Sequence, residues 1–525
     1  MLYLGLDSST QSLTAILIDA SEARPAIVWQ RSLNFDETLP HYGTRHGVLP
    51  NADPRVARSS PRMWAEALDR MFALMSAEAG VDRSRLAAIA GSAQQHGSVY
   101  LSDAATSRLS SLDPARALVD QLDGIWSRDE SPIWMDSSTA AECAEITRAI
   151  GGASVLAELT GSRAFERFTG PQVRKFFHDD PEGYARTSRV HLVSSFMASL
   201  LAGGHAPIDP GDGSGMNLMD LAARTWSPAA VDATAPGLAA KLPPIAESWT
   251  VTGTLAPYWQ RRYGLPPAKV VAWTGDNPSS LVGTGLVEEG RVAVSLGTSD
   301  TIFGAMPAPR VDRSGTGHVF GAPTGAYMGI TVFKNGSLAR ERVRDAMRLD
   351  WPGFARALRD SPTGNGGGLM LPWFEPEITP TVLTPGVHER DLAAGDPPAR
   401  VRAVVEGQMM AMARHSRWMG VTIDAIHATG GAAASREILQ VMADVFDATV
   451  RRFEVGNSAC LGAALRAWHA DAQSAGRPVS WRAVTDAFVR PTGEAIAPAP
   501  GAREVYARLI ARQAELEAEI LARLR

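Results

Sequence analysis

Cysteine and lysine are scarce in this chain of 525 residues. The two cysteines, Cys143 and Cys460, fall in segments with helical periodicity, so neither a disulfide framework nor a four-cysteine zinc site is available. None of the four lysines follows a glycine, which excludes the Gly-Lys pair of a Walker A phosphate loop. The HRD and DFG motifs of protein kinases are also missing. A reducing, cytoplasmic compartment is the simplest prediction.

Long apolar runs and a strong net charge are absent as well. The longest apolar stretch, 192–203, is shorter than the ~20 residues of a membrane helix and contains three serines, so we expect a core helix. Asp7 interrupts the amino-terminal apolar run before a signal-peptide core forms. The formal charge of −5 gives no electrostatic reason for binding nucleic acid or an anionic membrane. We therefore expect a globular enzyme with neither as a partner.

Two segments of the chain have the same layout, in which a polar turn separates two apolar runs. The first covers 2–19 and the second covers 291–305. Apolar runs of strand length around a polar turn predict a β-hairpin. Amphipathic helical segments lie between the strand-like runs, which is typical of an α/β core. We therefore predict two copies of one α/β unit, with domains at 1–285 and 286–525.

The turn of the first predicted hairpin combines an acid with small polar residues. Asp7 is followed by Ser8, Ser9, Thr10 and Gln11. Backbone N–H groups of such a turn suit a phosphate, whereas the carboxylate of Asp7 repels one and acts through a divalent cation. This pairing favours a site for Mg²⁺ and a nucleotide. The alternative is an ordinary hairpin with a capped turn.

The order of several motifs indicates a family. They are "LGLDSSTQS", "GSAQQHGSVY", "TGSRAFERFTGPQ", "TGDNPSSL", "AVSLGTSDT" and "ATGGAAASREILQVMADVFDA". Each is weak alone, but together the chain resembles the FGGY carbohydrate kinases from end to end. The resemblance implies an α/β fold of two ribonuclease-H-like (actin-like ATPase) domains with a nucleotide cleft between them.

The resemblance also implies residues that bind the sugar. His96, Arg167, Asp276 and Asn277 would contact a ketose. Asp276 would be the base that accepts the proton of the terminal hydroxyl, because an alcohol is a poor nucleophile until a carboxylate orients it. The expected reaction converts ATP and D-xylulose into ADP and D-xylulose 5-phosphate.

A further set of residues is expected to bind Mg²⁺ and ATP by the same resemblance. Asp7 would hold the magnesium through water. The residues expected at the nucleotide are Thr10, Gln11, Gly297 and Thr298 for the phosphates, and Trp351, Gly430, Gly431 and Ser435 for the adenosine. The family usually has an asparagine at the place of Ser435, so the sequence leaves the nucleotide preference open.

Several of these residues also have ordinary structural interpretations. His96 would satisfy backbone groups in a loop, and Arg163 and Arg167 would form salt bridges. Asp136 would begin a helix, since Asp before Ser-Ser-Thr is a good N-cap signal. The acids of "IDPGDGSG" would belong to ordinary turns.

Other functions also stay open at this point. The alternative substrates are ribulose, glycerol and a sugar acid. A non-catalytic sugar sensor and an ATPase of the actin and chaperone type are the alternatives from other classes, and a homodimer is left open.

Overall fold

The computed structural model describes residues 1–21, 25–78, 80, 82–393, 395–453 and 456–524. They form two compact units. Unit 1 comprises Met1–Val287, Val319–Tyr327 and Gly456–Val489, and unit 2 comprises Glu288–His318, Met328–Val455 and Arg490–Arg525. Because the chain returns to unit 1 twice, no single position in the sequence divides the two compact units. The division into 1–285 and 286–525 therefore stays a proposal about sequence domains.

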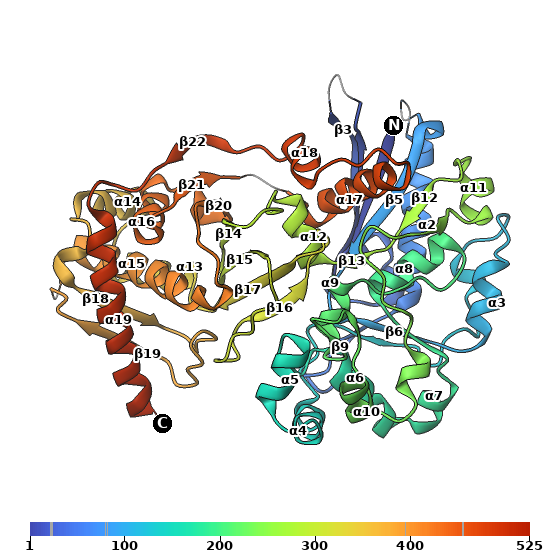
Figure 1. Ribbon diagram of the computed structural model, residues 1–525, viewed down its shortest axis with the longest axis horizontal. Helices are drawn as coiled ribbons and strands as arrows, with labels where there is room; N and C mark the ends of the chain where they lie inside the picture. The colour runs from blue at the N-terminus through green and yellow to red at the C-terminus, as the bar shows by residue number, and fades with distance from the viewer. Residues whose placement is uncertain (22–24, 79, 81, 394, 454–455, 525) are drawn as a thin grey trace. The chain divides into compact units, whose positions relative to one another are not determined.

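Unit 1 is built on a seven-stranded mixed sheet in the order β11-β12-β5-β1-β2-β3, with β13 also paired to β5 (Figure 1). Its strands are β1 (Leu2–Ser8), β2 (Ser12–Asp19), β3 (Ala26–Asn34), β5 (Leu86–Ala93), β11 (Val251–Thr254), β12 (Lys269–Val271) and β13 (Thr274–Gly275). β1 pairs with β2 antiparallel, which confirms the first predicted hairpin. β1 and β13 both run parallel to β5. The carboxyl ends of these three strands therefore lie at the same edge of the sheet.

The sheet of unit 1 is covered on both faces, which explains why β1 is apolar at successive positions. Leu2, Leu4 and Leu6 pack into a core with the helices α2 (Pro61–Ala77) and α8 (Val193–Ala202). Tyr3 lies on the other face, in a second core with α17 (Ser458–Ser474). Alternate side chains of one strand therefore enter two different cores.

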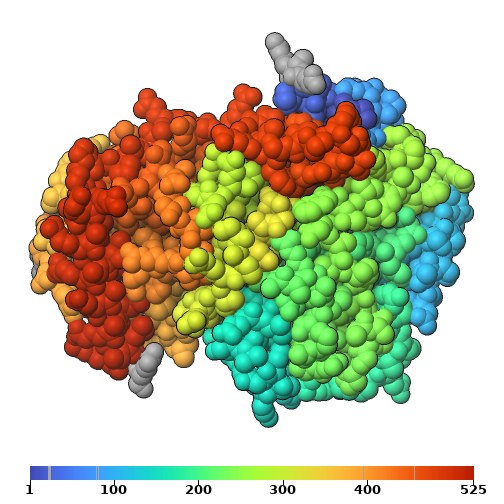
Figure 2. All heavy atoms as spheres, in the orientation of Figure 1, coloured from blue at the N-terminus to red at the C-terminus, as the bar shows by residue number. Residues whose placement is uncertain are grey.

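Helix α17 approaches its neighbours in unit 1 unusually closely. It packs on α12 (Asp276–Gly283) and on β1 and β5. A Cβ atom on Gly283 would lie 1.9 Å from the Ser458 carbonyl oxygen, and one on Gly462 would lie 2.0 Å from the Ser279 carbonyl oxygen. Only glycine allows this backbone contact. Figure 2 shows the orange-red atoms of 456–489 beside blue atoms of the amino-terminal part of unit 1.

The remaining elements of unit 1 are short helices and two-stranded ribbons. The helices are α1 (Phe35–Thr38), α3 (Ala104–Ser110), α4 (Ala140–Ala149), α5 (Ala153–Thr160), α6 (Thr169–Asp179), α7 (Pro181–Arg186), α9 (Pro210–Gly213), α10 (Pro228–Thr234), α11 (Pro257–Tyr263) and α18 (Trp481–Asp486). The ribbons pair β4 (Arg58–Ser59) with β7 (Ser131–Pro132), β6 (Ser98–Leu101) with β8 (Arg189–Leu192), and β9 (Met219–Asp220) with β10 (Thr225–Trp226).

Unit 2 repeats the plan with a sheet in the order β17-β15-β14-β20-β21-β22. Its strands are β14 (Arg291–Leu296), β15 (Asp300–Met306), β17 (Tyr327–Phe333), β20 (Ala425–Thr429), β21 (Thr449–Arg452) and β22 (Thr492–Ile496), with a separate ribbon of β18 (Leu369–Trp373) and β19 (Gly386–Arg390). The strand β16 (His318–Gly321) falls, except for His318, in the unit 1 segment Val319–Tyr327. Its helices are α13 (Ser337–Ala346), α14 (Trp351–Asp360), α15 (Pro397–His415), α16 (Arg436–Phe446) and α19 (Ala502–Leu524). The antiparallel pairing of β14 with β15 confirms the second predicted hairpin.

The segment 192–203, expected to be a core helix, contains the buried helix α8. Cys143 lies in α4 and Cys460 in α17, and both are free thiols. Across the described residues, every helix is too short or too polar to span a bilayer.

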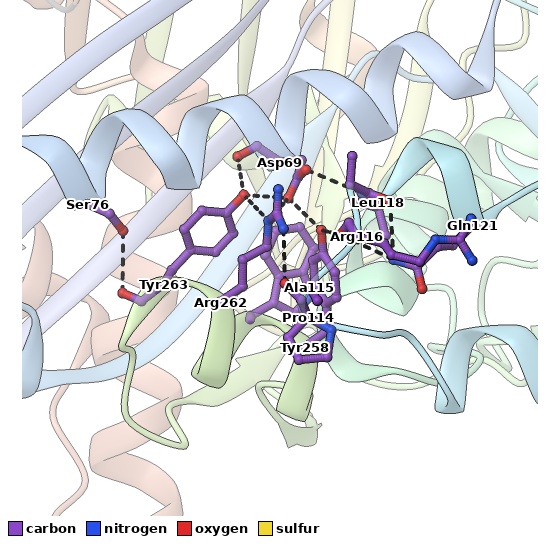
Figure 3. Close-up of polar contacts among 12 residues, drawn as sticks. Asp69, Ser76, Pro114, Ala115, Arg116, Leu118, Gln121, Tyr258, Arg262 and Tyr263 are labelled. Carbon is purple, nitrogen blue, oxygen red and sulfur yellow. Dashed lines mark hydrogen bonds and ion pairs between the residues drawn. The ribbon is translucent and has the colours of Figure 1, made fainter.

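A buried carboxylate ties α2 to α11 and to the loop before residue 121 (Figure 3). Asp69 is 8% exposed, and its Oδ1 accepts hydrogen bonds from Tyr258 at 2.8 Å and Tyr263 at 2.5 Å. Its Oδ2 accepts from the Leu118 N–H at 3.3 Å, and Arg262 Nε lies 3.5 Å from Oδ1. Burial, together with the charge of Asp69, raises the pKa of both tyrosines, so they stay hydroxyl donors.

Removing this carboxylate should destabilise unit 1. We expect Asp69→Ala to lower the free energy of unfolding by about 3 kcal/mol, because two phenols and an amide lose their acceptor in the interior. Urea unfolding followed by tryptophan fluorescence measures the change. Asp129→Ala, at a side chain that is 83% exposed, is the matched control, with an expected change of about 0.5 kcal/mol or less. Equal midpoints for the two variants would show that the network contributes nothing.

Candidate active site

The turn between β1 and β2 carries the first group of predicted residues. Asp7 is the register partner of Ser92 on β5, and the Ser92 hydroxyl donates to Asp7 Oδ1 at 2.7 Å. Thr10 and Gln11 lie in the turn, and Gln11 is exposed. The Thr10 hydroxyl oxygen accepts a hydrogen bond from the Trp134 indole at 2.8 Å. The turn therefore presents polar groups beside a carboxylate, as the sequence predicts.

Asp276 reaches the same place from a distant part of the chain. It is the first residue of α12 and follows β13, whose Thr274 pairs with Ser92 of β5. Asp7 therefore lies opposite Ser92 on one side of β5, and Asp276 comes two residues after the partner of Ser92 on the other side, so both lie at the carboxyl ends of strands parallel to β5. This edge of an α/β sheet is where such folds bind ligands.

Both carboxyl groups keep their protons to a higher pH than a free aspartate does, since the pKa of each is raised. Burial raises the pKa of Asp7 to about 6, and the bond from Ser92 only partly opposes this. Burial and the negative charge of Asp7 raise the pKa of Asp276 to about 7, although the N–H groups of Asn277 and Gln95 favour its ionised form. The site is thus a carboxylate pair that titrates near neutrality, as a general base requires.

His96 lies in a strained loop conformation with φ of 70°, which places a non-glycine residue in the left-handed region. It is buried, its Nδ1 lies 2.8 Å from the Gly215 carbonyl oxygen, and its ring stacks on Phe168 at 4.3 Å. Since a carbonyl only accepts, His96 Nδ1 carries a proton and donates it to the Gly215 carbonyl oxygen. The histidine therefore satisfies a backbone group, as its structural interpretation expects, while its ring orientation is fixed.

Arg167 meets His96 at the same aromatic ring. Its guanidinium lies 5.8 Å from the Phe168 ring and 5.3 Å from the Phe165 ring. Burial lowers the pKa of Arg167, against the opposing charge of Glu166. Arg163 is exposed and stacks over Phe165 at 4.7 Å. Phe168, which the sequence reasoning missed, brings the two predicted sugar-binding residues together.

Asn277 joins the motifs "QQHGS" and "TGDNP". Its Nδ2 donates to Gln95 Oε1 at 2.8 Å and to Asp276 Oδ1 at 3.1 Å. Its backbone N–H donates to Asp276 Oδ1 at 2.7 Å. The amide therefore braces the candidate base.

Neighbouring acids have structural roles. Asp136 is 2% exposed and accepts from the Ala57 N–H at 3.1 Å and from Gln172 Nε2 at 2.8 Å. The prediction that Asp136 begins a helix is wrong, because α4 begins at Ala140 after Thr139, and the carboxylate instead joins separate segments. Asp209 caps α9 by accepting from the Asp212 N–H, which is the turn chemistry expected of it.

Unit 2 holds a cavity of about 650 Å³ that five of the predicted nucleotide residues line. They are Gly297, Thr298, Trp351, Gly431 and Ser435. Gly430 precedes this set with φ of 85°, and a Cβ there would lie 2.5 Å from the Leu296 carbonyl oxygen. Only glycine fits that position. The second hairpin turn, the glycine turn and the start of α14 therefore surround one cavity within unit 2.

Two side chains at this cavity are already engaged. The Ser435 hydroxyl caps α16 by accepting from the Ile438 N–H at 3.3 Å, and it also donates to Glu437 at 3.3 Å. Trp351 is 44% exposed, and the Arg344 guanidinium lies 4.5 Å from its ring. Ser435 thus serves the helix, whereas Trp351 presents a large aromatic surface at the cavity.

Two α/β units, each opened by a hairpin with a polar turn, define the fold of the two-domain sugar kinases. A solved xylulose kinase from Rhodospirillum rubrum aligns with a TM-score of 0.83 at 22% identity over 100% of both chains. A glycerol kinase of Plasmodium falciparum with ADP aligns with a TM-score of 0.77 at 14% identity, over 99% of this chain and 97% of that one. These likenesses establish the two-domain actin-like fold.

Sequence comparison identifies the family. Residues 130–283 match the N-terminal domain and residues 292–470 the C-terminal domain of the FGGY family of carbohydrate kinases. The chain is 44% identical to a xylulose kinase of Rattus norvegicus over 99% of this chain and 97% of that protein. It is 42% identical to xylulose kinase 2 of Arabidopsis thaliana, over 89% and 87% respectively. The chain belongs to the FGGY family and is an ATP-dependent carbohydrate kinase.

Proposed function

We propose that this kinase transfers the terminal phosphoryl group of ATP to the terminal hydroxyl of D-xylulose and releases D-xylulose 5-phosphate. The choice of sugar rests on the relatives that the chain matches along nearly their whole length, which are xylulose kinases. The observation that carries the chemistry is the carboxylate pair of Asp7 and Asp276 at adjoining strand ends of unit 1.

Asp276 is the proposed base of the reaction. Its carboxylate accepts a hydrogen bond from the terminal hydroxyl, orients the oxygen and takes the proton late in transfer. Asn277 keeps the carboxylate in place through its backbone and side-chain N–H groups. We propose that His96, Arg167 and Asn277 hold the rest of the sugar.

Asp7 is the proposed anchor for Mg²⁺. Carboxylate and hydroxyl oxygens are hard donors, which fit this ion. Among the described residues no three His, Cys, Asp or Glu side chains gather into a metal cluster. That fits Mg²⁺, which usually keeps several waters and is bound through one or two carboxylates and the substrate phosphates. The ion supplies charge neutralisation at the phosphates, and Asp7 would hold it through water.

The nucleotide is assigned to residues of both domains, 1–285 and 286–525. We propose that Thr10, Gln11, Gly297 and Thr298 hold the phosphates through hydroxyl, amide and backbone groups. The adenosine part is assigned to Trp351, Gly430, Gly431 and Ser435, at and beside the cavity of unit 2. We also propose a cytoplasmic location and leave open whether the protein is a homodimer.

A coupled assay of ADP release tests the proposal. D-xylulose, L-xylulose, D-ribulose, L-ribulose, glycerol and gluconate are compared with MgATP, with a control lacking sugar. The expected result is a strong preference for D-xylulose. Preference for another sugar would refute the substrate but keep the kinase, and ADP release that ignores every sugar would indicate an ATPase.

The loss of activity at low pH should reflect the protonation of the proposed base, Asp276. Because Asp276 acts as a carboxylate and its pKa lies at about 7, we expect kcat/KM for the sugar to decline as pH falls through about 7. Below that range the loss should reach about tenfold for each pH unit. The assay is repeated across the range with saturating MgATP. A profile that stays flat well below about pH 6 would contradict this role of Asp276.

A further inference from the structure

Gln95 lies between the candidate base and the short helix α9. It is 3% exposed and lies two residues after the end of β5. Its Nε2 donates to the Gly211 carbonyl oxygen at 3.4 Å, and its Oε1 accepts from Asn277 Nδ2 at 2.8 Å. Its backbone N–H also favours the ionised form of Asp276. One residue therefore contacts both members of the Asp276–Asn277 pair.

The Gln95 side chain packs closely against the backbone at Gly275. A Cβ atom on Gly275 would lie 2.4 Å from Gln95 Cγ and 2.8 Å from its Nε2, so the chain before Asp276 covers the amide. On the far side lies the backbone of Gly211. Glycine at 275 thus makes room for this glutamine.

The chemistry of these partners fixes which way each amide faces. The Gly211 carbonyl only accepts, so Gln95 must present Nε2 to it and Oε1 to Asn277. Asn277 must then present Nδ2 to Gln95, and the same Nδ2 also reaches Asp276 Oδ1. Its Oδ1 consequently faces away from both, and no donor reaches it in the part of the chain that the structure describes.

We propose that Gln95 is a positioning residue that holds the Asn277 amide so that Oδ1 accepts a hydrogen bond from a sugar hydroxyl. This inference rests on the proposed function, in which Asn277 contacts the sugar. Without the glutamine amide, Asn277 Nδ2 keeps only its longer bond to Asp276 Oδ1, at 3.1 Å. The Asn277 amide is then held by one acceptor in place of two, so its Oδ1 is less firmly placed for the sugar hydroxyl.

The chain offers a matched control at the preceding residue. Gln94 has the same side chain and is 1% exposed, yet neither of its amide atoms has a hydrogen-bond partner among the described residues. Methionine has nearly the same length and volume as glutamine but lacks its polar atoms. Gln94→Met and Gln95→Met therefore differ in whether they remove the bond to Asn277.

A double-mutant cycle tests the inference. The full chain and its Gln95→Met, Gln94→Met, Asn277→Ala and Gln95→Met/Asn277→Ala variants are assayed for kcat and for the KM of D-xylulose and ATP. We expect Gln95→Met to raise the sugar KM roughly tenfold while the KM of ATP stays within about twofold. In the Asn277→Ala background it should change the sugar KM by less than about twofold, since its partner is already gone.

A second variant keeps the test decisive. Gln95→Leu replaces Gln95→Met in the cycle if the methionine variant does not fold. The inference would be overturned if the fold-changes in sugar KM of the two single variants, Gln95→Met and Asn277→Ala, multiplied in the double variant. It would also be overturned if Gln95→Met had the same kinetic constants as Gln94→Met. Failure of the parent protein to phosphorylate any sugar would instead overturn the proposed function.

Discussion

Asp276→Asn should lower kcat roughly 100- to 10,000-fold while the KM for the sugar changes little. The amide still occupies the site and contacts the sugar hydroxyl, but it takes no proton. Turnover does not vanish, because positioning and neutralisation of charge on the phosphates do not depend on this group. The coupled assay of ADP release with D-xylulose measures both constants.

The same variant should be more stable than its parent, which separates lost chemistry from lost fold. The folded-state pKa of Asp276 is raised to about 7, above the unfolded value of about 4, so the native state loses stability as pH rises through this window. The neutral amide removes that penalty. At about pH 8 we expect a gain of roughly 2 kcal/mol, reduced because Asp276 is partly exposed.

Thermal unfolding of both proteins at about pH 5 and about pH 8 checks the sign. The difference should be largest at the higher pH. Asp129→Asn, on an exposed side chain, is the control and should match the parent at both values. A kcat within about tenfold of the parent would remove Asp276 from its proposed role.

Arg340→Met should destabilise unit 2 by about 3 to 5 kcal/mol, since it leaves a carboxylate buried without its partner. Arg340 and Asp300 are 0% and 1% exposed, and the guanidinium holds both carboxylate oxygens, at 2.7 and 3.0 Å. The same guanidinium donates to Gln408 at 2.9 Å. Burial raises the pKa of Asp300, and the charge of Arg340 opposes this rise.

The pair also supports the second hairpin turn, because the Gly297 N–H bonds to the Asp300 carboxylate. We therefore expect the KM for ATP to rise as well. Urea unfolding measures the stability. Arg342→Met, on the same helix with its side chain 58% exposed, is the control, and its effect should stay below about 1 kcal/mol. An Asp300→Leu/Arg340→Met variant should regain most of the loss, because neither charge is then buried alone. Equal midpoints for Arg340→Met and Arg342→Met would refute the argument.

Local patterns predicted the hairpins and the core helix correctly. An apolar run, a polar turn and a second apolar run describe antiparallel neighbours within about 20 residues, so no distant contact is needed to recognise them. The prediction that Asp136 begins a helix was wrong because distant residues, rather than its neighbours in sequence, decide its contacts. An aspartate before Ser-Ser-Thr is a good cap locally, but its carboxylate is taken by Ala57 and Gln172, which lie far away in sequence.

The candidate site could be predicted residue by residue but not as an arrangement. His96 and Arg167 were found by resemblance, whereas the ring of Phe168 that joins them was not. Gln95 belongs to a motif that drew attention only to its histidine. Ser435 was expected at the base of the nucleotide, and its hydroxyl is occupied as a helix cap. Which partner a polar side chain takes depends on what the fold brings beside it.

The sequence by itself determined two α/β units, each with a polar turn between strands, and an acid at the tip of the first strand. It determined the family as well, because the order of many short motifs is specific even where each motif is weak. Only the tertiary structure placed Asp276 beside Asp7, through the pairing of β1 and β13 with the same strand. It alone returned α17 to unit 1, where glycines admit the contact. Local periodicity encodes elements, whereas burial and strand pairing between distant residues decide which side chains meet.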